Sequence, residues 1–345
     1  MNRKHFIQRM GVLGTGLAVM PKNDVFLNTP GNPQNTACKK PPYLKKGDVI
    51  GITSPAGFIT LEQIQPAIAV MESWGYQCKV GSTIGKRDFT YGGTDDERRT
   101  DLQQMLDDPS IAAIMCARGG YGSVRIVDGL DWKKMIKKPK WVIGFSDITV
   151  LHNHIHTHCK VASIHSKMIN SFPDDWATAE PIQIETIISI KDALEGRQMK
   201  YTAIPNAQNK AGVGAGMLVG GNLRTLENLS GTASDITTDG KILFIEDTGE
   251  YLYSIDRMLW NLKRTGKLAH LKGLIVGGFK VKTDVDEEPF GKTVPDMVLE
   301  KVAAYNYPVC FDFPVGHQRA NFALKCGVIH QLNITNSKAE LTEIV

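Results

Sequence analysis

From Asp48 onward, short apolar runs alternate with stretches of helical spacing, and this alternation constrains the fold more than any other feature. Ile111–Ala117 is a continuous apolar run, and Asp48–Thr53 and Trp141–Phe145 are further candidate strands, with helical stretches at Leu61–Trp74 and Thr94–Leu106 between them. Thr94 and Glu97 have the spacing of a capping box at the start of the second helix. Further helices are expected at Ser123–Leu130, at Asp147–His158 and near Ile182–Leu194. Strands that are apolar on both faces need cover on both sides, and strands that alternate with helices are typical of parallel sheets. The sequence therefore predicts an α/β fold whose N-terminal domain holds a parallel sheet of the flavodoxin or Rossmann type.

The second half of the chain has a less regular pattern. We expect strands at four apolar runs: Lys241–Glu246, Leu274–Phe279, Val309–Phe313 and Leu324–Ile329. Tyr253–Arg264 has helical spacing, with apolar residues on one face. This half is predicted to be a β-rich, mixed α/β domain. The expected division is a leader and linker at residues 1–41, the N-terminal domain at 42–170, a crossover linker at 171–210 and the C-terminal domain at 211–345.

Length and composition narrow the class of protein. A chain of 345 residues suggests two domains, and 42% hydrophobic with 22% charged residues is typical of a globular enzyme. The net charge of +4 is too small to indicate nucleic-acid binding. The sequence contains no run of 18 apolar residues, so no membrane span is predicted. None of the six cysteines forms a C-x-x-C pair.

The N-terminus has the form of an export signal. Arg3 and Lys4 precede a glycine-rich apolar run, Met10–Met20, in a pattern close to a twin-arginine signal with Lys as the second basic residue. We therefore expect a periplasmic or exported protein. A cytoplasmic location with an ordinary amphipathic leader is the alternative.

Two motifs follow predicted strands of the first sheet. Trp141–Asp147 runs from an apolar strand into Gly-Phe-Ser-Asp and then a helix, as in a nucleophile elbow that exposes Ser146. A serine that simply caps a helix is the alternative. Arg118-Gly119-Gly120-Tyr121-Gly122 also follows a strand, where glycines let a ligand approach the backbone, although a tight turn explains them equally well. Its spacing is not that of a dinucleotide-binding loop.

Two further motifs lie in the second half. Glu246 and Asp247 end an apolar strand, at the edge of a sheet where ligands bind. His317 lies in a Gly- and Pro-containing loop and is a possible general base. A solvated strand end and an ordinary loop histidine are the alternatives.

Four histidines alternate along one segment: His152, His154, His156 and His158. On a helix they form two i,i+4 pairs on opposed faces, so they do not converge on one ion. We interpret them as packing or surface residues and predict no metal site.

Several motifs occur in a fixed order along the chain. They are Thr53–Gly57, Gly93–Arg98, Arg118–Gly122, Gly144–Asp147, Gly220–Leu223, Ile245–Asp247, Ile255–Met258 and Gly316–His317. With this set the chain resembles the LD-carboxypeptidase family of serine peptidases, which includes muramoyltetrapeptide carboxypeptidases and microcin-C immunity peptidases. The resemblance extends from about Pro42 to Leu341.

This resemblance implies a catalytic triad of Ser146, Glu246 and His317 in a cleft between two domains. Ser146 would attack the scissile carbonyl, His317 would transfer its proton, and Glu246 would orient His317. The N–H of Asp147 is the expected first oxyanion donor, and the Gly119–Gly120 turn, through Gly120, the second. The family needs no metal or organic cofactor, and its members are commonly homodimers.

The expected substrate is a murein tetrapeptide that loses its terminal D-alanine. Arg118 and Arg319 are candidates to bind its carboxylate, with Gly119 and Tyr121 as further contacts. Two alternatives remain: a microcin-C-like peptidase acting on an aminoacyl- or peptidyl-nucleotide amide, and a wall-peptide binding protein without catalysis. The chain also departs from the family pattern, with Ser166-Lys167 after His165 where Gly-Pro is usual.

Overall fold

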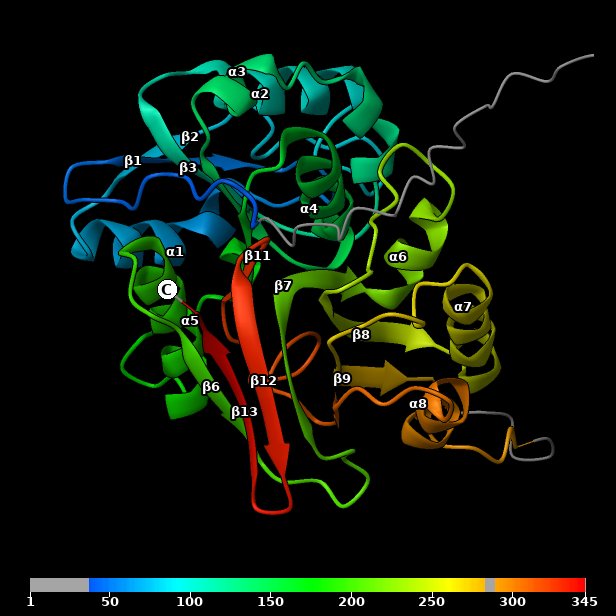
Figure 1. The fold of residues 1–345 in the computed structure, drawn as a ribbon. Coiled ribbons are helices and arrows are strands. Elements are labelled where there is room, and N and C mark those ends of the chain that lie inside the picture. Colours follow the sequence, from blue (N-terminus) through cyan, green and yellow to red (C-terminus); the bar gives the residue numbers. More distant parts are fainter. Residues whose placement is uncertain (1–36, 283–288, 345) are drawn as a thin grey trace, which may run out of the picture. The chain divides into compact units, whose positions relative to one another are not determined.

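The computed structural model describes residues 37–282 and 289–344, and these form two β-sheets with helices packed against them (Figure 1). The predicted export signal lies outside the described residues. Within the described ranges, no helix is long and apolar enough to cross a lipid bilayer.

The first sheet has six strands in the order β11-β5-β4-β3-β1-β2. Its members are β1 (Val49–Thr53), β2 (Gln77–Val80), β3 (Ile111–Cys116), β4 (Trp141–Gly144), β5 (Ser163–His165) and β11 (Leu324–Cys326). Strands β1 to β5 are parallel, as predicted, and β11 pairs antiparallel with β5.

Successive residues of β3 belong to different hydrophobic clusters, which explains why the whole strand is apolar. Ala113 and Met115 belong to one hydrophobic cluster, whereas Ile114 and Cys116 belong to another. Helix α1 (Leu61–Ser73) contributes to the first cluster and α2 (Asp95–Asp107) to the second, and Figure 1 shows these helices on opposite sides of the sheet. Since successive side chains of a strand point to opposite faces, both faces of this sheet are buried.

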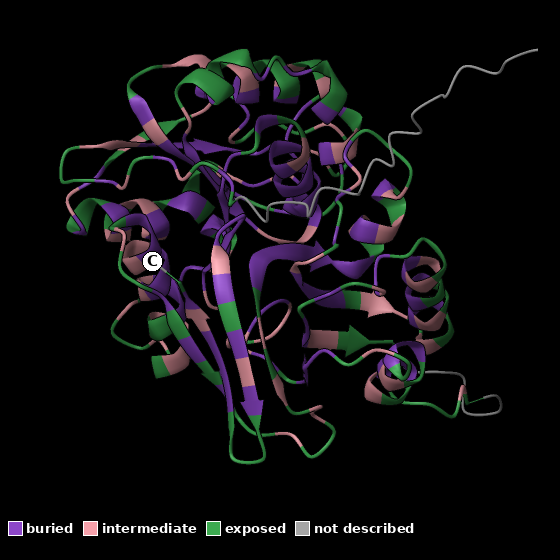
Figure 2. Ribbon diagram, viewed as in Figure 1, coloured by how far each residue is buried: buried purple, intermediate pink, exposed green. Residues whose placement is uncertain are grey.

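The second sheet has seven strands in the order β10-β9-β8-β7-β12-β13-β6. Its members are β6 (Lys200–Ala203), β7 (Gly212–Asn222), β8 (Ile242–Glu250), β9 (Gly273–Val281), β10 (Val309–Cys310), β12 (Ile329–Thr335) and β13 (Lys338–Glu343). Strands β7 to β10 are parallel and the other three are antiparallel, which confirms the mixed sheet. Figure 2 shows that buried residues alternate with more exposed ones along β12, which lies between β7 and β13, whereas β8 is buried as far as Asp247.

Three features differ from the sequence prediction. The run Leu324–Ile329 is not one strand, because a turn at Gly327 separates β11, in the first sheet, from β12, in the second. Strand β7 was not predicted because its Gly-rich sequence lacks an apolar run. The linker 171–210 contains the helix predicted near Ile182–Leu194, which is α5 (Pro181–Leu194), but it also contains β6, which was not predicted.

The remaining helices cover the two sheets. They are α3 (Lys133–Lys137), α4 (Thr149–His154), α6 (Leu223–Leu229), α7 (Leu252–Arg264) and α8 (Val294–Val302). The predicted capping box of α2 is present. Glu97 Oε2 accepts the N–H of Thr94 at 2.9 Å, and Thr94 Oγ1 accepts the N–H of Glu97 at 3.3 Å. The helix expected at Ser123–Leu130 is instead two short 3-10 turns. The one expected at Asp147–His158 is a 3-10 turn, then α4, then a π-helical turn that ends at Cys159.

Candidate active site

Ser146 lies where β4 turns into a helix. Its backbone has a φ of +61°, in the left-handed region that non-glycine residues seldom adopt, at a cost of about 1–3 kcal/mol. The residue begins the 3-10 turn Ser146–Ile148, which leads directly into α4. A sharp, strained strand-to-helix turn is the geometry that lifts a serine hydroxyl above the end of a sheet. The turn therefore has the form of a nucleophile elbow rather than an ordinary helix cap, and the Ser146 side chain makes no capping hydrogen bond there.

Gly119 lies directly against Ser146. A Cβ atom at Gly119 would approach Ser146 Cβ to 3.1 Å and Oγ to 3.3 Å. Its carbonyl accepts a hydrogen bond of 2.9 Å from the N–H of Gly57, which fixes this loop in place. The Gly119–Gly120 turn predicted from the sequence thus forms one wall beside the serine.

Glu246 and His317 form a hydrogen-bonded pair. Glu246 is fully buried near the end of the apolar part of β8, and its Oε2 accepts a hydrogen bond of 2.5 Å from His317 Nδ1. The residue before His317 must be glycine, because Gly316 has a φ of +93° and a Cβ there would lie 2.3 Å from Glu246 Cβ. Asn321 Oδ1 accepts the N–H of Gly316 at 2.9 Å and holds the loop.

The same loop brings His317 beside the serine turn. The rings of His317 and Phe145, the residue before Ser146, lie 4.9 Å apart between centroids. Three residues from separate parts of the sequence are therefore grouped at one place in the fold. Within the described residues, no hydrogen bond joins Ser146 Oγ to His317.

A cavity of about 470 Å³ opens beside Ser146. It is lined by Gly120, Tyr121, Val124, Ser146, Asp147, Val150, Asn222, Arg224, Thr225, Asn228, Asp247, Thr248 and Glu250. The N–H groups of Gly120 and Asp147, the two predicted oxyanion donors, have no hydrogen-bond acceptor among the residues described. Most of the residues that line the cavity are polar or charged, and both halves of the chain contribute to it.

Two aspartates near the serine accept hydrogen bonds from backbone N–H groups. Asp147 Oδ2 accepts the N–H of Ser123 at 2.8 Å, and Asp247 accepts the N–H groups of Arg224 and Thr248 at 2.9 and 2.7 Å. Burial raises the pKa of Asp147 and raises that of Asp247 to about 6. Asn222, which sequence reasoning missed as a site residue, donates from Nδ2 to Asp247 Oδ1 at 3.0 Å. The motif Gly220-Gly221-Asn222 is the sequence feature that could have identified Asn222 as a site residue.

The two predicted carboxylate-binding arginines do not line this cavity. Arg118 is exposed and donates to the carbonyl of Phe58 at 2.9 Å. Arg319 forms an ion pair with Glu180, in which Nη1 donates to both carboxylate oxygens at 2.6 Å. The cation that does line the cavity is Arg224, which the sequence analysis did not select.

The four alternating histidines each contact a different protein group. His152 bonds the carbonyl of Gly144, His154 the hydroxyl of Ser234, His156 that of Ser163 and His158 the carbonyl of Ala233. The described part of the chain contains no group of three or more His, Cys, Asp or Glu side chains placed to hold a metal.

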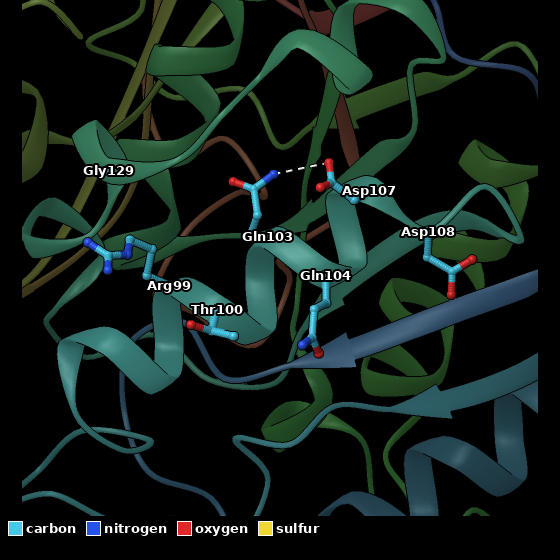
Figure 3. A pocket seen from close by; sticks show the side chains of 7 residues that line it. All are labelled: Arg99, Thr100, Gln103, Gln104, Asp107, Asp108 and Gly129. Atoms are coloured by element: carbon cyan, nitrogen blue, oxygen red, sulfur yellow. Dashed lines mark hydrogen bonds between the residues drawn. The ribbon is translucent and has the colours of Figure 1, made fainter.

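Another cavity, of about 420 Å³, lies along the outer side of α2 and is drawn in Figure 3. It is lined mainly by Arg99, Gln103, Gln104 and Asp107 of that helix. None of the residues grouped around Ser146 contributes to it.

Family models match the chain in two blocks. The model for the LD-carboxypeptidase N-terminal domain matches residues 50–166, and the model for the C-terminal domain matches residues 215–332. The chain belongs to the LD-carboxypeptidase family. The N-terminal block contains Ser146, and the C-terminal block contains Glu246 and His317.

Relatives of this LD-carboxypeptidase match the chain over most of their length. The probable murein peptide carboxypeptidase of Bacillus subtilis is 33% identical over 302 residues, which cover 87% of this chain and 93% of the relative. A crystal structure of muramoyltetrapeptide carboxypeptidase from Oxalobacter formigenes is 27% identical, with a TM-score of 0.75 over 86% of this chain and 98% of that one. The microcin C7 self immunity protein MccF shares the fold at a TM-score of 0.76, with 24% identity over 88% of this chain and 98% of that one.

These matches confirm the family and the fold, a parallel-rich sheet with a second mixed sheet. They also support a hydrolase of the carboxypeptidase type. The roles of individual residues, the substrate and the predicted domain boundaries stay predictions.

Proposed function

We propose that the protein is a serine-type LD-carboxypeptidase that removes the terminal D-alanine from murein tetrapeptides during peptidoglycan turnover. The observation that carries this proposal is the buried Glu246–His317 hydrogen bond of 2.5 Å next to a serine held at positive φ. A nucleophile, a base and a group that orients the base are the parts that acyl transfer by a serine requires.

Each residue has a definite task in this mechanism. Ser146 Oγ attacks the carbonyl of the L,D bond while His317 Nε2 takes its proton, and His317 then protonates the amine of the leaving D-alanine. Glu246 accepts the Nδ1–H, which fixes the tautomer and stabilises the imidazolium. Water hydrolyses the acyl-enzyme by the same sequence of proton transfers. In unliganded enzymes the contact from serine to base is often long and shortens when substrate binds.

The N–H groups of Gly120 and Asp147 are the proposed oxyanion donors. Both line the cavity beside Ser146, and neither has an acceptor among the described residues. The N–H of the residue after the nucleophile is the usual first donor of such a site. Donors fixed in place before the reaction stabilise the charge that develops on the carbonyl oxygen.

The substrate class is proposed from the relatives. The Bacillus protein is named a murein peptide carboxypeptidase and the Oxalobacter structure a muramoyltetrapeptide carboxypeptidase. The N-terminal leader predicts that this chain meets its peptide outside the inner membrane, with the cytoplasm as the alternative. Assembly as a homodimer is a further prediction from the family.

The test is a comparison of substrates by mass spectrometry. Wild type and Ser146→Ala are each incubated with a disaccharide-tetrapeptide, with the free tetrapeptide and with an aminoacyl-sulfamoyl adenosine. We expect wild type alone to remove one alanine from both peptides. Cleavage of the sulfamoyl compound only would transfer the function to a microcin-C-like peptidase. Tight peptide binding without product would make the protein a binding protein.

A further inference from the structure

Lys167 differs from the other buried lysines of the molecule. Within residues 37–282 and 289–344, five lysines are buried, and four of them have an acceptor: Lys140 the carbonyl of Met105, Lys267 that of Ile236, Lys301 the carboxylate of Asp256 and Lys325 that of Glu343. Lys167 is only 7% exposed, and its Nζ makes neither a hydrogen bond nor an ion pair with any described residue. The Nζ atom itself is not among the fully enclosed polar atoms of the described residues, so it is open to the cavity that Lys167 lines, where a ligand can reach it.

Lys167 lines a cavity of about 620 Å³, which is distinct from the one beside Ser146. Besides Lys167, its walls include Asp174, Asp175, Thr178, Glu180 and Arg319. A carboxylate or a polar molecule of a few heavy atoms fits a cavity of this size.

The acidic residues of this cavity do not neutralise Lys167. Glu180 is bound to Arg319, and Asp175 accepts hydrogen bonds from Ala177 N–H at 2.9 Å and Thr178 Oγ1 at 3.2 Å. Asp174, Asp175 and Glu180 are exposed, whereas Lys167 is buried. Burial alone lowers the pKa of Lys167, to about 8. An ammonium group in this setting gains most from an added carboxylate.

Two segments of this cavity adjoin the reaction centre. Ser166 N–H donates to the carbonyl of Gly144 at 3.1 Å, two residues before the nucleophile. A Cβ built on Gly119 would lie 3.2 Å from Cε of Met168. On the other wall, Arg319 is two residues beyond His317. The leaving amine must face His317, and the departing residue carries the free carboxylate one carbon away from that amine.

We propose that Lys167 binds the C-terminal carboxylate of the peptide and thereby restricts the enzyme to the last residue of the chain. This inference rests on the proposed function and adds the determinant of exopeptidase specificity. An endopeptidase has no use for a buried cation at this place, because the chain it cuts continues past the leaving residue.

The test compares the murein tetrapeptide with the same peptide ending in a carboxamide. Wild type should prefer the free acid by about 10- to 100-fold in kcat/KM, the range expected from one charge-assisted hydrogen bond. Lys167→Met should lose this preference, because its kcat/KM on the free acid falls while its kcat/KM on the carboxamide changes by less than about 3-fold. Lys167→Arg should retain part of it, and Lys133→Met, at an exposed surface lysine, should behave as wild type.

The outcomes separate this inference from the proposed function. Wild type that cleaves neither peptide refutes the function itself. Wild type that cleaves both equally well, or a folded Lys167→Met that keeps the preference, refutes the role of Lys167 alone. A folded variant that is inactive on both peptides assigns Lys167 to another task. Thermal unfolding checks folding, and Lys167→Gln repeats the test if the methionine variant unfolds.

Discussion

Replacing Glu246 with glutamine should remove activity without weakening the fold. The Glu246 carboxylate is fully buried, with Oε2 bonded to His317 and Oε1 without a hydrogen-bond partner among the described residues. Glutamine keeps the shape and removes the charge. Since a half-satisfied buried charge is costly, the free energy of unfolding should stay within about 1 kcal/mol of wild type or rise.

The loss of activity follows from the geometry. An imidazolium and a carboxylate with charge centres about 4 Å apart interact by about 4 kcal/mol at an effective dielectric of 20. This attraction exists only while His317 carries the serine proton, so losing it raises the barrier. The predicted decrease in kcat is about 10³-fold, and an amide N–H facing Nδ1 would add to it by favouring the wrong tautomer.

The assay measures kcat/KM on the tetrapeptide and urea unfolding of the same samples. Asp247→Asn is the matched control, because it removes the neighbouring buried carboxylate. Its oxygens accept three hydrogen bonds, so that variant should lose about 1–3 kcal/mol of stability. Glu246→Gln with activity within 10-fold of wild type would refute the assigned role of Glu246.

Three further predictions follow from the same contacts. Ser146→Gly should be about 1 kcal/mol more stable than Ser146→Ala in urea unfolding, because glycine adopts the observed φ without strain, and equal stabilities would contradict that strain. Gly119→Ala should lower kcat/KM at least about 10-fold with little change in melting temperature, since the added methyl displaces the serine, and an unaffected rate would count against this contact. Burial lowers the pKa of His152, His154 and His330 to about 4, that of His156 to about 3, and that of His165 well below its usual value. The unfolded chain therefore binds more protons than the folded one below pH 6.5, and the free energy of unfolding should fall as the solution is acidified. Each of these histidines contributes about 1 kcal/mol between pH 6.5 and 5.5, and the raised pKa values of Asp147 and Asp247 act in the opposite direction, which leaves a loss on the order of 3 to 4 kcal/mol. Urea unfolding that gives equal stability at the two pH values would contradict this prediction.

The features of the fold that depend on a local sequence pattern were predicted correctly. The apolar runs of β1, β3 and β4 are buried on both faces, and the Thr94–Glu97 cap starts α2 where expected. The strand-to-helix turn at Ser146 was likewise visible as an apolar run followed by Gly-Phe-Ser.

Features set by distant contacts were not predictable in this way. Strand β7 consists largely of glycines and small residues, and its pairing with β8 and β12 defines it as a strand. Arg118 and Arg319 were selected for their closeness to motifs in sequence, yet a carbonyl and Glu180 bind them in the fold. Lys167 was noticed only as a departure from the family pattern, because its burial without a partner is a property of tertiary packing.

Chirally resolved analysis of released alanine tests the central claim most directly. The account predicts that wild type releases one D-alanine per murein tetrapeptide, and that Ser146→Ala, still folded, releases at least 10³-fold less. Release of any other fragment, or undiminished release by Ser146→Ala, would contradict it.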